Sequence, residues 1–229
     1  MKAAPVDLAT GVLAQERKRI ATPQPATPDA MAPVVRELVD HFDWTGNVGV
    51  SFPTVVHHGV ARSAANIDTS WIGTDIDAVF TEATGHPVHV INDADAAGLA
   101  EVRYGAGRDR DGVVILFTFG TGVGSGFFLD GELVPNTELG HLEIDGHVAE
   151  KQAAASARDR EGLSWKEWAG RVDRYLDRIV FLFSPDLIII GGGVSRKAEK
   201  WLSYVDVGVE IVPAALTNDA GIVGAALIA

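Results

Sequence analysis

One stretch of the chain restricts the fold more than any other. Residues 113–119 form an apolar, β-prone run, and glycines then stand at every second position from Gly120 to Gly126. A short apolar run of this kind predicts a buried strand, and glycine lets the backbone turn sharply and approach a ligand closely. Residues 127–129 are again strand-like, whereas a dinucleotide-binding fingerprint would continue into a helix. The stretch therefore predicts a hairpin whose turn offers backbone N–H groups to a phosphate, with a bulged hairpin that binds nothing as the alternative.

Strand and helix patterns alternate over the rest of the chain. The clearest helix is 164–183, which opens with a Ser164–Glu167 capping box and ends before Pro185. The continuous apolar run Leu187–Ile190 is typical of a strand in a parallel sheet that is covered on both faces. We expect the other strands at 47–52, 86–91, 112–119, 126–129 and 132–135, and the other helices at 28–42, 74–84, 93–104 and from 219. This alternation predicts α/β architecture.

Charge and composition exclude several classes of protein. The 229 residues carry 19 basic and 31 acidic side chains, so the net charge is −12, which disfavours nucleic acid and anionic membranes as partners. The apolar runs are far shorter than the ~20 residues needed to span a bilayer, and no secretory signal opens the sequence. The absence of cysteine excludes disulfides, thiolate metal sites and a cysteine nucleophile. We expect a cytoplasmic protein.

The segment Asn92–Gly98 places carboxylates directly after a predicted strand, at the start of a predicted helix. A carboxylate at the carboxyl end of a strand faces the crevice where open α/β sheets bind ligands, so Asp93 is a candidate base that takes a proton from a hydroxyl. Asp95 is better suited to the first helical turn, where its charge offsets the helix dipole. The alternative is that both aspartates only cap the helix.

A second polar group, Glu138 to His141 with Glu143 close behind, could clamp a polyol through hydrogen bonds or ligate a metal. The metal reading is the weaker one, because there is no cysteine and the remaining histidines are scattered. For these other histidines we expect solvated or internally satisfied side chains.

Three glycines, Gly191–Gly193, follow the apolar strand and precede Ser195, which could cap a short helix over 196–201. Such a turn brings backbone against a nucleotide or phosphate, and tight helix–strand packing is the alternative. Basic residues cluster near glycines twice in this acidic chain, and both clusters are candidates for guiding phosphates, with a solvated face as the alternative. They are Arg196, Lys197 and Lys200, and Arg103, Arg108 and Arg110.

These stretches, in this order, resemble the ROK family of sugar kinases, and within it the polyphosphate-dependent glucokinases. The resemblance covers nearly the whole chain. It rests on residues 22–28, 64–74, 92–100, 103–107, 118–124, 135–141, 190–198 and 219–226. It implies an actin-like ATPase fold of the hexokinase and ribonuclease H type, with two lobes flanking a cleft, a smaller one over 1–92 and a larger one over 93–229.

The resemblance also implies a reaction and a set of roles. Glucose would be phosphorylated on its 6-hydroxyl by inorganic polyphosphate, with ATP as a second donor and Mg²⁺ accompanying the donor. Asp93 would be the base, while Asn92, Glu138, His141 and Glu150 would bind the sugar. Gly120, Thr121 and Gly122 would form a phosphate loop, and Gly192 and Gly193 would border the donor. Homodimers are usual among such relatives. A non-catalytic sugar-binding relative and an inactive kinase remain the alternatives.

The sequence departs from the family pattern at three places. Relatives often carry a cysteine-rich zinc loop after the histidine, but residues 142–150 contain no cysteine, so no structural zinc is expected. The sequence begins just after the position of the family's N-terminal strand and phosphate-binding turn, so that strand is expected to be missing. Thr54 stands after Pro53 where glycine is usual, near the expected sugar site.

Overall fold

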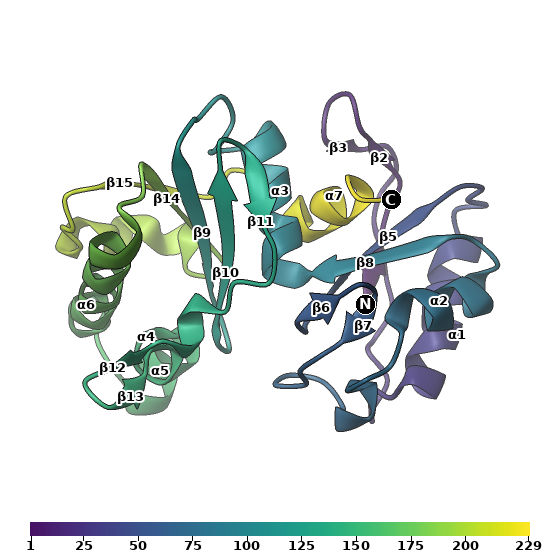
Figure 1. Ribbon diagram of the computed structural model, residues 1–229, viewed down its shortest axis with the longest axis horizontal. Helices are drawn as coiled ribbons and strands as arrows, with labels where there is room; N and C mark the ends of the chain where they lie inside the picture. The colour runs from purple at the N-terminus through teal and green to yellow at the C-terminus, as the bar shows by residue number, and fades with distance from the viewer. The chain divides into compact units, whose positions relative to one another are not determined.

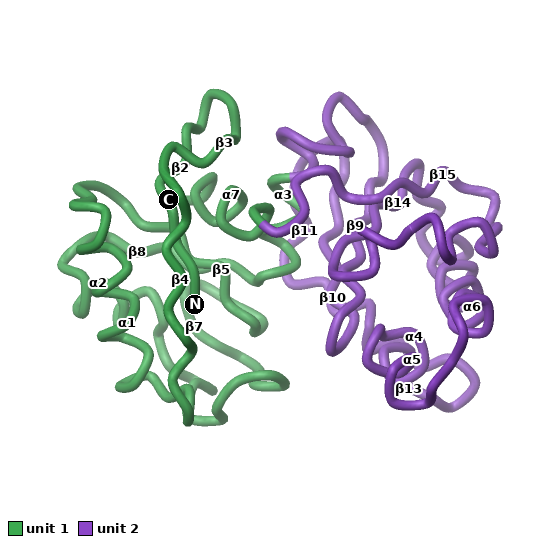
Figure 2. The backbone as a smooth tube through the Cα atoms, turned by 180° about the vertical axis from the view of Figure 1, so that it is seen from behind, with its two compact units in different colours: residues 1–100, 219–229 green, residues 101–218 purple.

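The structure is a computed structural model that describes residues 1–229. The chain forms two compact units, coloured separately in Figure 2. Unit 1 comprises Met1–Ala100 together with Asp219–Ala229, and unit 2 comprises Glu101–Asn218. Residues 93–100 and the last eleven residues therefore pack with unit 1, whereas the sequence prediction divided the chain after residue 92.

Unit 2 is built on a mixed five-stranded sheet in the order β11-β10-β9-β14-β15 (Figure 1). The β9–β10 and β10–β11 pairs are antiparallel, while β14 runs parallel to both β9 and β15. The strands are β9 (Val113–Phe119), β10 (Val123–Leu129), β11 (Glu132–Val134), β14 (Leu187–Gly191) and β15 (Glu210–Pro213). Every residue of β14 is buried, as the continuous apolar run predicted.

Helix α6 (Trp165–Phe183) covers one face of this sheet. Its apolar stripe, which includes Trp168, Tyr175 and Ile179, shares one buried cluster with Ile188 and Ile190 of β14. Both hydrogen bonds of the predicted capping box, between Ser164 and Glu167, are present. The shorter elements of unit 2 are α4 (Ala149–Ala153), α5 (Ala155–Glu161), β12 (Glu143–Ile144), β13 (His147–Val148) and the 3₁₀ turns η2 (Leu139–His141), η3 (Ser195–Lys200) and η4 (Leu202–Tyr204).

Unit 1 is organised around the parallel pair β5 (Val48–Phe52) and β8 (Val88–Asn92). Its helices are α1 (Pro28–Asp40), α2 (Ile76–Thr84), α3 (Asp93–Tyr104, whose last turn belongs to unit 2) and α7 (Ala220–Ala226). Its remaining elements are β1 (Lys2–Ala3), β2 (Val6–Asp7), β3 (Val12–Leu13), β4 (Lys18–Arg19), β6 (Val56–His57), β7 (Val60–Ala61) and the 3₁₀ turns η1 (Thr69–Trp71) and η5 (Thr217–Asp219). A buried aromatic group of Phe52, Trp71 and Phe80 forms the centre of its core.

Glycine explains why α7 belongs to unit 1. A Cβ on Gly224 would overlap the backbone of Ala96 in α3, and a Cβ on Gly49 would overlap the backbone of Ala225. The C-terminal helix thus packs backbone against backbone on both α3 and β5, which only glycine allows.

One strand boundary differs from the sequence prediction. Strand β10 begins at Val123 rather than at residue 126, so Gly124 and Gly126 lie within a strand and only Gly120 and Gly122 belong to the turn. Thr27 occupies the N-cap position of α1, but its side chain makes no capping hydrogen bond. No helix of the structure is long and apolar enough to cross a membrane.

Candidate active site

The first glycine loop, Gly120–Gly122, is the predicted hairpin turn between β9 and β10. The N–H of Gly120 donates to the carbonyl of Gly122 at 2.9 Å, which closes the turn and leaves Gly120 and Thr121 exposed. A Cβ on Gly122 would overlap the Glu150 carboxylate, so a larger residue there would have to displace that side chain. The turn therefore offers exposed backbone to a ligand while one side of it is packed against Glu150.

The second glycine loop, Gly191–Gly193, adjoins the first. It leaves β14, whose Gly191 is in register with Thr118 of the parallel strand β9. Gly192 has a φ of 79°, and a Cβ there would lie 2.5 Å from the carbonyl oxygen of Phe119. Both loops thus stand at the carboxyl ends of neighbouring parallel strands, where α/β sheets bind ligands.

Ser195 has a different role from the predicted one. Its hydroxyl donates to the carbonyl oxygen of Gly192 at 2.8 Å and makes no cap hydrogen bond to the following residues. Those residues form a 3₁₀ segment with a break at Lys197 rather than an α-helix. Ser195 therefore fixes the conformation of the second glycine loop.

Side chains from α4 and α5 hold the first glycine loop from the other side. The N–H of Ser156 donates to Gly120 at 3.0 Å, and its hydroxyl donates to the carbonyl of Thr121 at 2.6 Å. The Glu150 carboxylate, 16% exposed, accepts from the N–H of Val123 at 3.3 Å and pairs with Lys151 at 3.0 Å. Sequence reasoning missed Ser156, because it lies 35 residues from its partner and no local motif marks it.

Glu138 is the N-cap residue of the 3₁₀ turn η2 and His141 ends that turn, with 3.3 Å between Glu138 Oε2 and His141 Nδ1. Both side chains are about half exposed, so they remain available to a polar ligand. Gly140 lies between them, and a Cβ there would overlap the carbonyl oxygen of Val123. The turn is therefore packed directly on β10.

Ser125 anchors the turn that carries this pair. Its hydroxyl, 3% exposed, donates to the carbonyl of Thr137 and accepts from the N–H of Leu139 at 3.1 Å. Ser125 interrupts the alternating glycines in the sequence, and this interruption was the only signal that the position differs from its neighbours. Its function is to position Glu138.

Unit 1 contributes the Asn92–Asp93 pair. The Asn92 side-chain oxygen accepts from the N–H groups of Ala94 and Asp95, at 2.8 and 3.1 Å, and its amide donates to the carbonyl of Thr54 at 2.9 Å. Asn92 therefore caps α3 and ties the cap to the segment after β5. One amide hydrogen of Asn92 takes part in none of these three bonds.

Asp93 is the first residue of α3 and is exposed at the surface. Neighbouring protein nevertheless displaces water from its carboxylate, and this desolvation raises its pKa above the ordinary value of 3.8. The backbone groups of Asp93 and Ala94 at the start of α3 oppose this shift in pKa. An accessible carboxylate with a raised pKa has the properties of a general base.

Thr54, the departure from the family pattern, is buried and fully engaged. Its hydroxyl donates to the carbonyl of Ser63 and accepts from the N–H of Ser63 at 3.2 Å. Ser63 in turn accepts from the N–H of Val55 at 3.1 Å. Thr54 thus joins the two sides of a loop through its hydroxyl, and its own backbone carbonyl accepts a hydrogen bond from the Asn92 amide.

The predicted site residues of unit 2 come together. Val123 links them, since its N–H donates to Glu150 beside Gly122 and its carbonyl packs on Gly140 between Glu138 and His141. The second glycine loop joins them through Phe119. Asn92 and Asp93 belong to unit 1.

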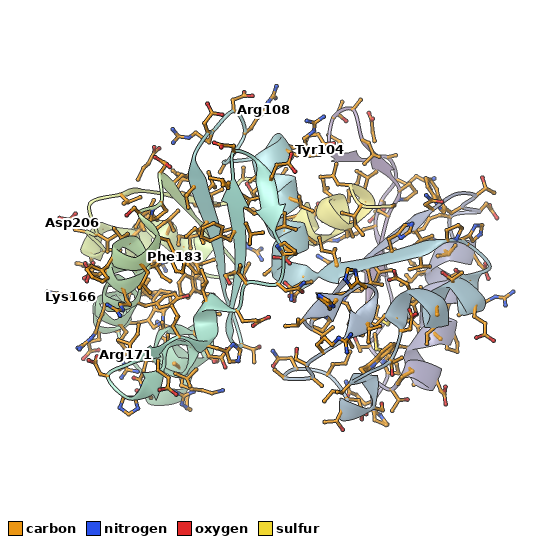
Figure 3. The ribbon with its side chains drawn as sticks, in the orientation of Figure 1. Tyr104, Arg108, Lys166, Arg171, Phe183 and Asp206 are labelled. Atoms are coloured by element: carbon orange, nitrogen blue, oxygen red, sulfur yellow. The ribbon has the colours of Figure 1, made fainter.

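One of the two predicted basic clusters lies elsewhere. Arg108 and Arg110 precede β9 and pair with Asp109 and Glu210. The glycine loop follows the other end of this seven-residue strand, about 20 Å away. Figure 3 shows Arg108 at the end of the β9–β10 hairpin opposite the turn. These arginines do not adjoin the loop.

No group of three or more histidine and carboxylate side chains could hold a metal ion. A metal that arrives with a phosphate ligand would therefore take most of its oxygen ligands from that ligand and from water. This arrangement fits Mg²⁺, which keeps several waters and binds through one or two carboxylates plus substrate phosphates. Glu150 is the carboxylate that contacts the first glycine loop.

Known proteins resemble this chain over nearly its whole length. The chain is 52% identical to the polyphosphate glucokinase of Mycobacterium tuberculosis strain CDC 1551 / Oshkosh over 97% of its length and 84% of that protein. The crystal structure of the inorganic polyphosphate/ATP-glucomannokinase from Arthrobacter sp. strain KM superimposes with a TM-score of 0.94 at 53% identity, covering 99% of this chain and 92% of that one.

A more distant structure has the same fold. The ROK family glucokinase from Streptomyces griseus, in complex with glucose and AMPPNP, superimposes with a TM-score of 0.79 at 25% identity, covering 98% of this chain and 94% of that one. These likenesses confirm the predicted actin-like ATPase fold. The ROK family model itself matches residues 1–162, so with these relatives the chain belongs to the ROK family.

Proposed function

We propose that this protein is a cytoplasmic glucokinase that transfers a phosphoryl group from inorganic polyphosphate to the 6-hydroxyl of glucose, with ATP as a second donor. The observation that carries the proposal is the pair of adjoining glycine loops after β9 and β14, in a chain 52% identical to a polyphosphate glucokinase. Two exposed backbone turns with no covalent nucleophile suit phosphoryl transfer, in which the protein mainly positions the reactants and stabilises charge.

Asp93 is proposed as the base. As the sugar oxygen attacks the terminal phosphorus, the carboxylate accepts the hydroxyl proton, and the bond to the bridging oxygen breaks to release a polyphosphate one unit shorter. The raised pKa of Asp93 favours this role, because a stronger base takes a hydroxyl proton more readily.

Glu138, His141, Asn92 and Glu150 are proposed to hold the sugar. The Glu138–His141 pair presents both an acceptor and a donor, which suits adjacent hydroxyls. Asn92 has one amide hydrogen left for a ligand, while Glu150 reaches the site beside the phosphate loop.

The donor phosphates are proposed to lie on Gly120, Thr121 and Gly122, bordered by Gly192 and Gly193. The donor phosphates and water would hold Mg²⁺, which neutralises negative charge on the donor when it is bound. Removal of divalent metal with EDTA is expected to abolish turnover, and full activity in EDTA would contradict the requirement.

The proposal is tested by glucose 6-phosphate formation with Mg²⁺ and polyphosphate, ATP or no donor. Product with polyphosphate and none without a donor is the expected result. Glucose binding by calorimetry without product from either donor would refute the kinase and favour a sugar-binding relative.

We also propose a homodimer. Phe181 and Leu182 near the end of α6 are 75% and 42% exposed, and an exposed large apolar side chain such as Phe181 is one that a second copy would cover. Sedimentation of the wild type as a dimer and of Phe181→Asp as a monomer is expected, and a monomeric wild type would contradict the proposal.

A further inference from the structure

A group of buried and half-buried aromatic side chains contacts residues next to both glycine loops. Phe119, which precedes the first loop, contacts Trp168 with ring centres 5.9 Å apart, and Trp168 contacts Trp201 at 4.9 Å. The indole N–H of Trp201 donates at 3.2 Å to the carbonyl of Val194, just after the second loop. Trp165 continues this group outward, 5.8 Å from Trp168.

Two cations are held against this outermost ring. The guanidinium carbon of Arg158 lies 3.9 Å from the centre of the Trp165 ring, and the ammonium of Lys197 lies 5.8 Å from it. Both distances are within the range of cation–π attraction. We call Arg158, Trp165 and Lys197 the Trp165 cation cluster.

The cluster adjoins the glycine loops along the chain on both sides. Arg158 follows Ser156, whose N–H and hydroxyl bond to the first loop. Lys197 comes four residues after Gly193 of the second loop, on the exposed segment η3. Arg196 and Lys200 flank Lys197 and also lack a carboxylate within ion-pair distance.

The acidic groups nearby leave this positive charge available. Asp159 pairs with Arg158 at 2.8 Å, but Asp159 is 74% exposed, and exposed ion pairs are weak and easily exchanged. Glu161 is bound by both Arg160 and Arg171. Glu199 is the one acidic residue of η3. Lys197, Arg196 and Lys200 are thus exposed cations directly after the second glycine loop, and Arg158 adds a partly buried one, so a negatively charged ligand would be attracted to this part of an otherwise acidic chain.

We propose that the Trp165 cation cluster binds the phosphates of an inorganic polyphosphate chain beyond those held in the glycine loops. This inference rests on the proposed function and names the feature of the donor that the cluster recognises. A long polyphosphate carries charge past the loops, whereas ATP ends in an uncharged nucleoside. The guanidinium of Arg158 also covers one face of Trp165, so adenine cannot stack on that face.

The test is direct binding of a long inorganic polyphosphate, of tripolyphosphate and of ATP, measured by calorimetry over a series of salt concentrations. Arg158→Gln with Lys197→Met removes both charges and keeps the side-chain stems. Arg108→Gln, an exposed arginine at the other end of β9, is the matched control. Circular dichroism checks that each variant is folded.

The double variant is expected to bind long polyphosphate about tenfold more weakly at low salt, with tripolyphosphate and ATP affinities within twofold. Its plot of log affinity against log salt should flatten by about 1.4, since each lost phosphate contact lowers the slope by ~0.7 for a flexible polyanion. A merely structural defect would weaken all three ligands and leave the slope unchanged.

Equal losses for the three ligands, or an unchanged slope, would overturn the inference. So would a loss in Arg108→Gln equal to that in the double variant. If the proposed function is wrong, the wild type will form no glucose 6-phosphate from polyphosphate, which is a different result from those above. The binding of long polyphosphate to the wild type and to the double variant would then still test the role of the cluster.

Discussion

Ser125→Ala tests whether the proposed sugar site in unit 2 can be disturbed without the proposed donor site. Ser125 is buried beneath the turn that carries Glu138 and His141, and its hydroxyl makes two hydrogen bonds to the backbone of that turn. Alanine removes both bonds and changes nothing else in shape or charge. The first glycine loop keeps its own supports, Ser156 and Glu150.

The size of the effect follows from the groups left without partners. A buried donor or acceptor that loses its hydrogen bond costs about 1–3 kcal/mol. Thr137 and Leu139 are only half-buried, so water reaches them and the sum lies near the low end, about 2 kcal/mol of unfolding free energy. Reordering one loosened residue on binding costs about 1–2 kcal/mol, which corresponds to a rise in the glucose KM of about fivefold to thirtyfold.

Thr137→Val is the matched control, because Thr137 lies in the same segment and its hydroxyl is buried with no hydrogen-bond partner. Valine has the same shape and leaves no polar atom unsatisfied, so stability should stay the same or rise by up to about 1 kcal/mol. Steady-state kinetics with each substrate varied in turn, together with thermal unfolding, measure both effects.

The expected pattern is a higher glucose KM for Ser125→Ala, a polyphosphate KM within twofold of wild type, and no change for Thr137→Val. An unchanged glucose KM in Ser125→Ala would refute the anchoring role. A parallel rise in both KM values would show that the hydroxyl supports the whole unit and not this turn.

The other predictions concern the base, the second loop and the core. Asp93→Asn should lower kcat by about 10²–10⁴ while calorimetry finds glucose affinity within threefold, and retained turnover would contradict the assignment. Desolvation raises the pKa of Asp93 in the free protein and protonation disables a base, so wild-type kcat/KM should fall with decreasing pH through a pKa above 3.8, and a fall only below 3.8 would contradict this. Gly192→Ala should raise the donor KM and cost about 2 kcal/mol or more of stability, because its φ of 79° and the nearby Phe119 carbonyl both oppose a Cβ; an unchanged donor KM would refute this. Tyr175→Phe removes a buried hydroxyl without a partner, so the free energy of unfolding should stay level or rise, and a loss above about 1 kcal/mol would reveal an unrecognised bond.

The elements that the sequence predicts well are those defined by local signals. Helix α6 begins at a capping box and stops before Pro185, and its limits agree with the prediction within one residue. Helix α3 spans the predicted 93–104, and strand β14 is buried throughout. Capping residues, prolines and the periodic spacing of hydrophobic residues act over a few positions, so they can be recognised in the sequence without knowledge of the tertiary structure.

The supports of the site could not be predicted, because their partners are distant in sequence. Ser125 bonds to residues 12 and 14 positions away, and Ser156 to one 35 positions away. Glu101 is fully buried and accepts from the N–H groups of Ala215 and Leu216, more than a hundred residues on, at 3.0 and 2.7 Å. No periodicity marks such residues, since the contact exists only after the sheet has formed.

Asn92 carries a local sequence signal for a helix cap as well as the sugar-binding role that the resemblance implies. An asparagine directly before a helical pattern is a strong N-cap candidate, and its side chain does cap α3. The resemblance assigned the same residue to the sugar. The two roles are compatible, because the cap uses the side-chain oxygen, whereas only one of the two amide hydrogens is used by Thr54. Capping also fixes the first turn of α3 and so the direction of Asp93.

The two parts of the unit 2 site are joined through the main chain of Val123 and through the side chains of Ser125 and Glu150. Val123 donates its N–H to Glu150, which packs on the phosphate loop, and its carbonyl packs on Gly140 in the turn of Glu138 and His141. Because Gly140 has no Cβ, no side chain separates that turn from β10. A shift of the hairpin is therefore passed to the turn by direct backbone contact. Ser125→Ala removes the hydroxyl part of this link, whereas a Cβ at position 140 would push the turn away from β10.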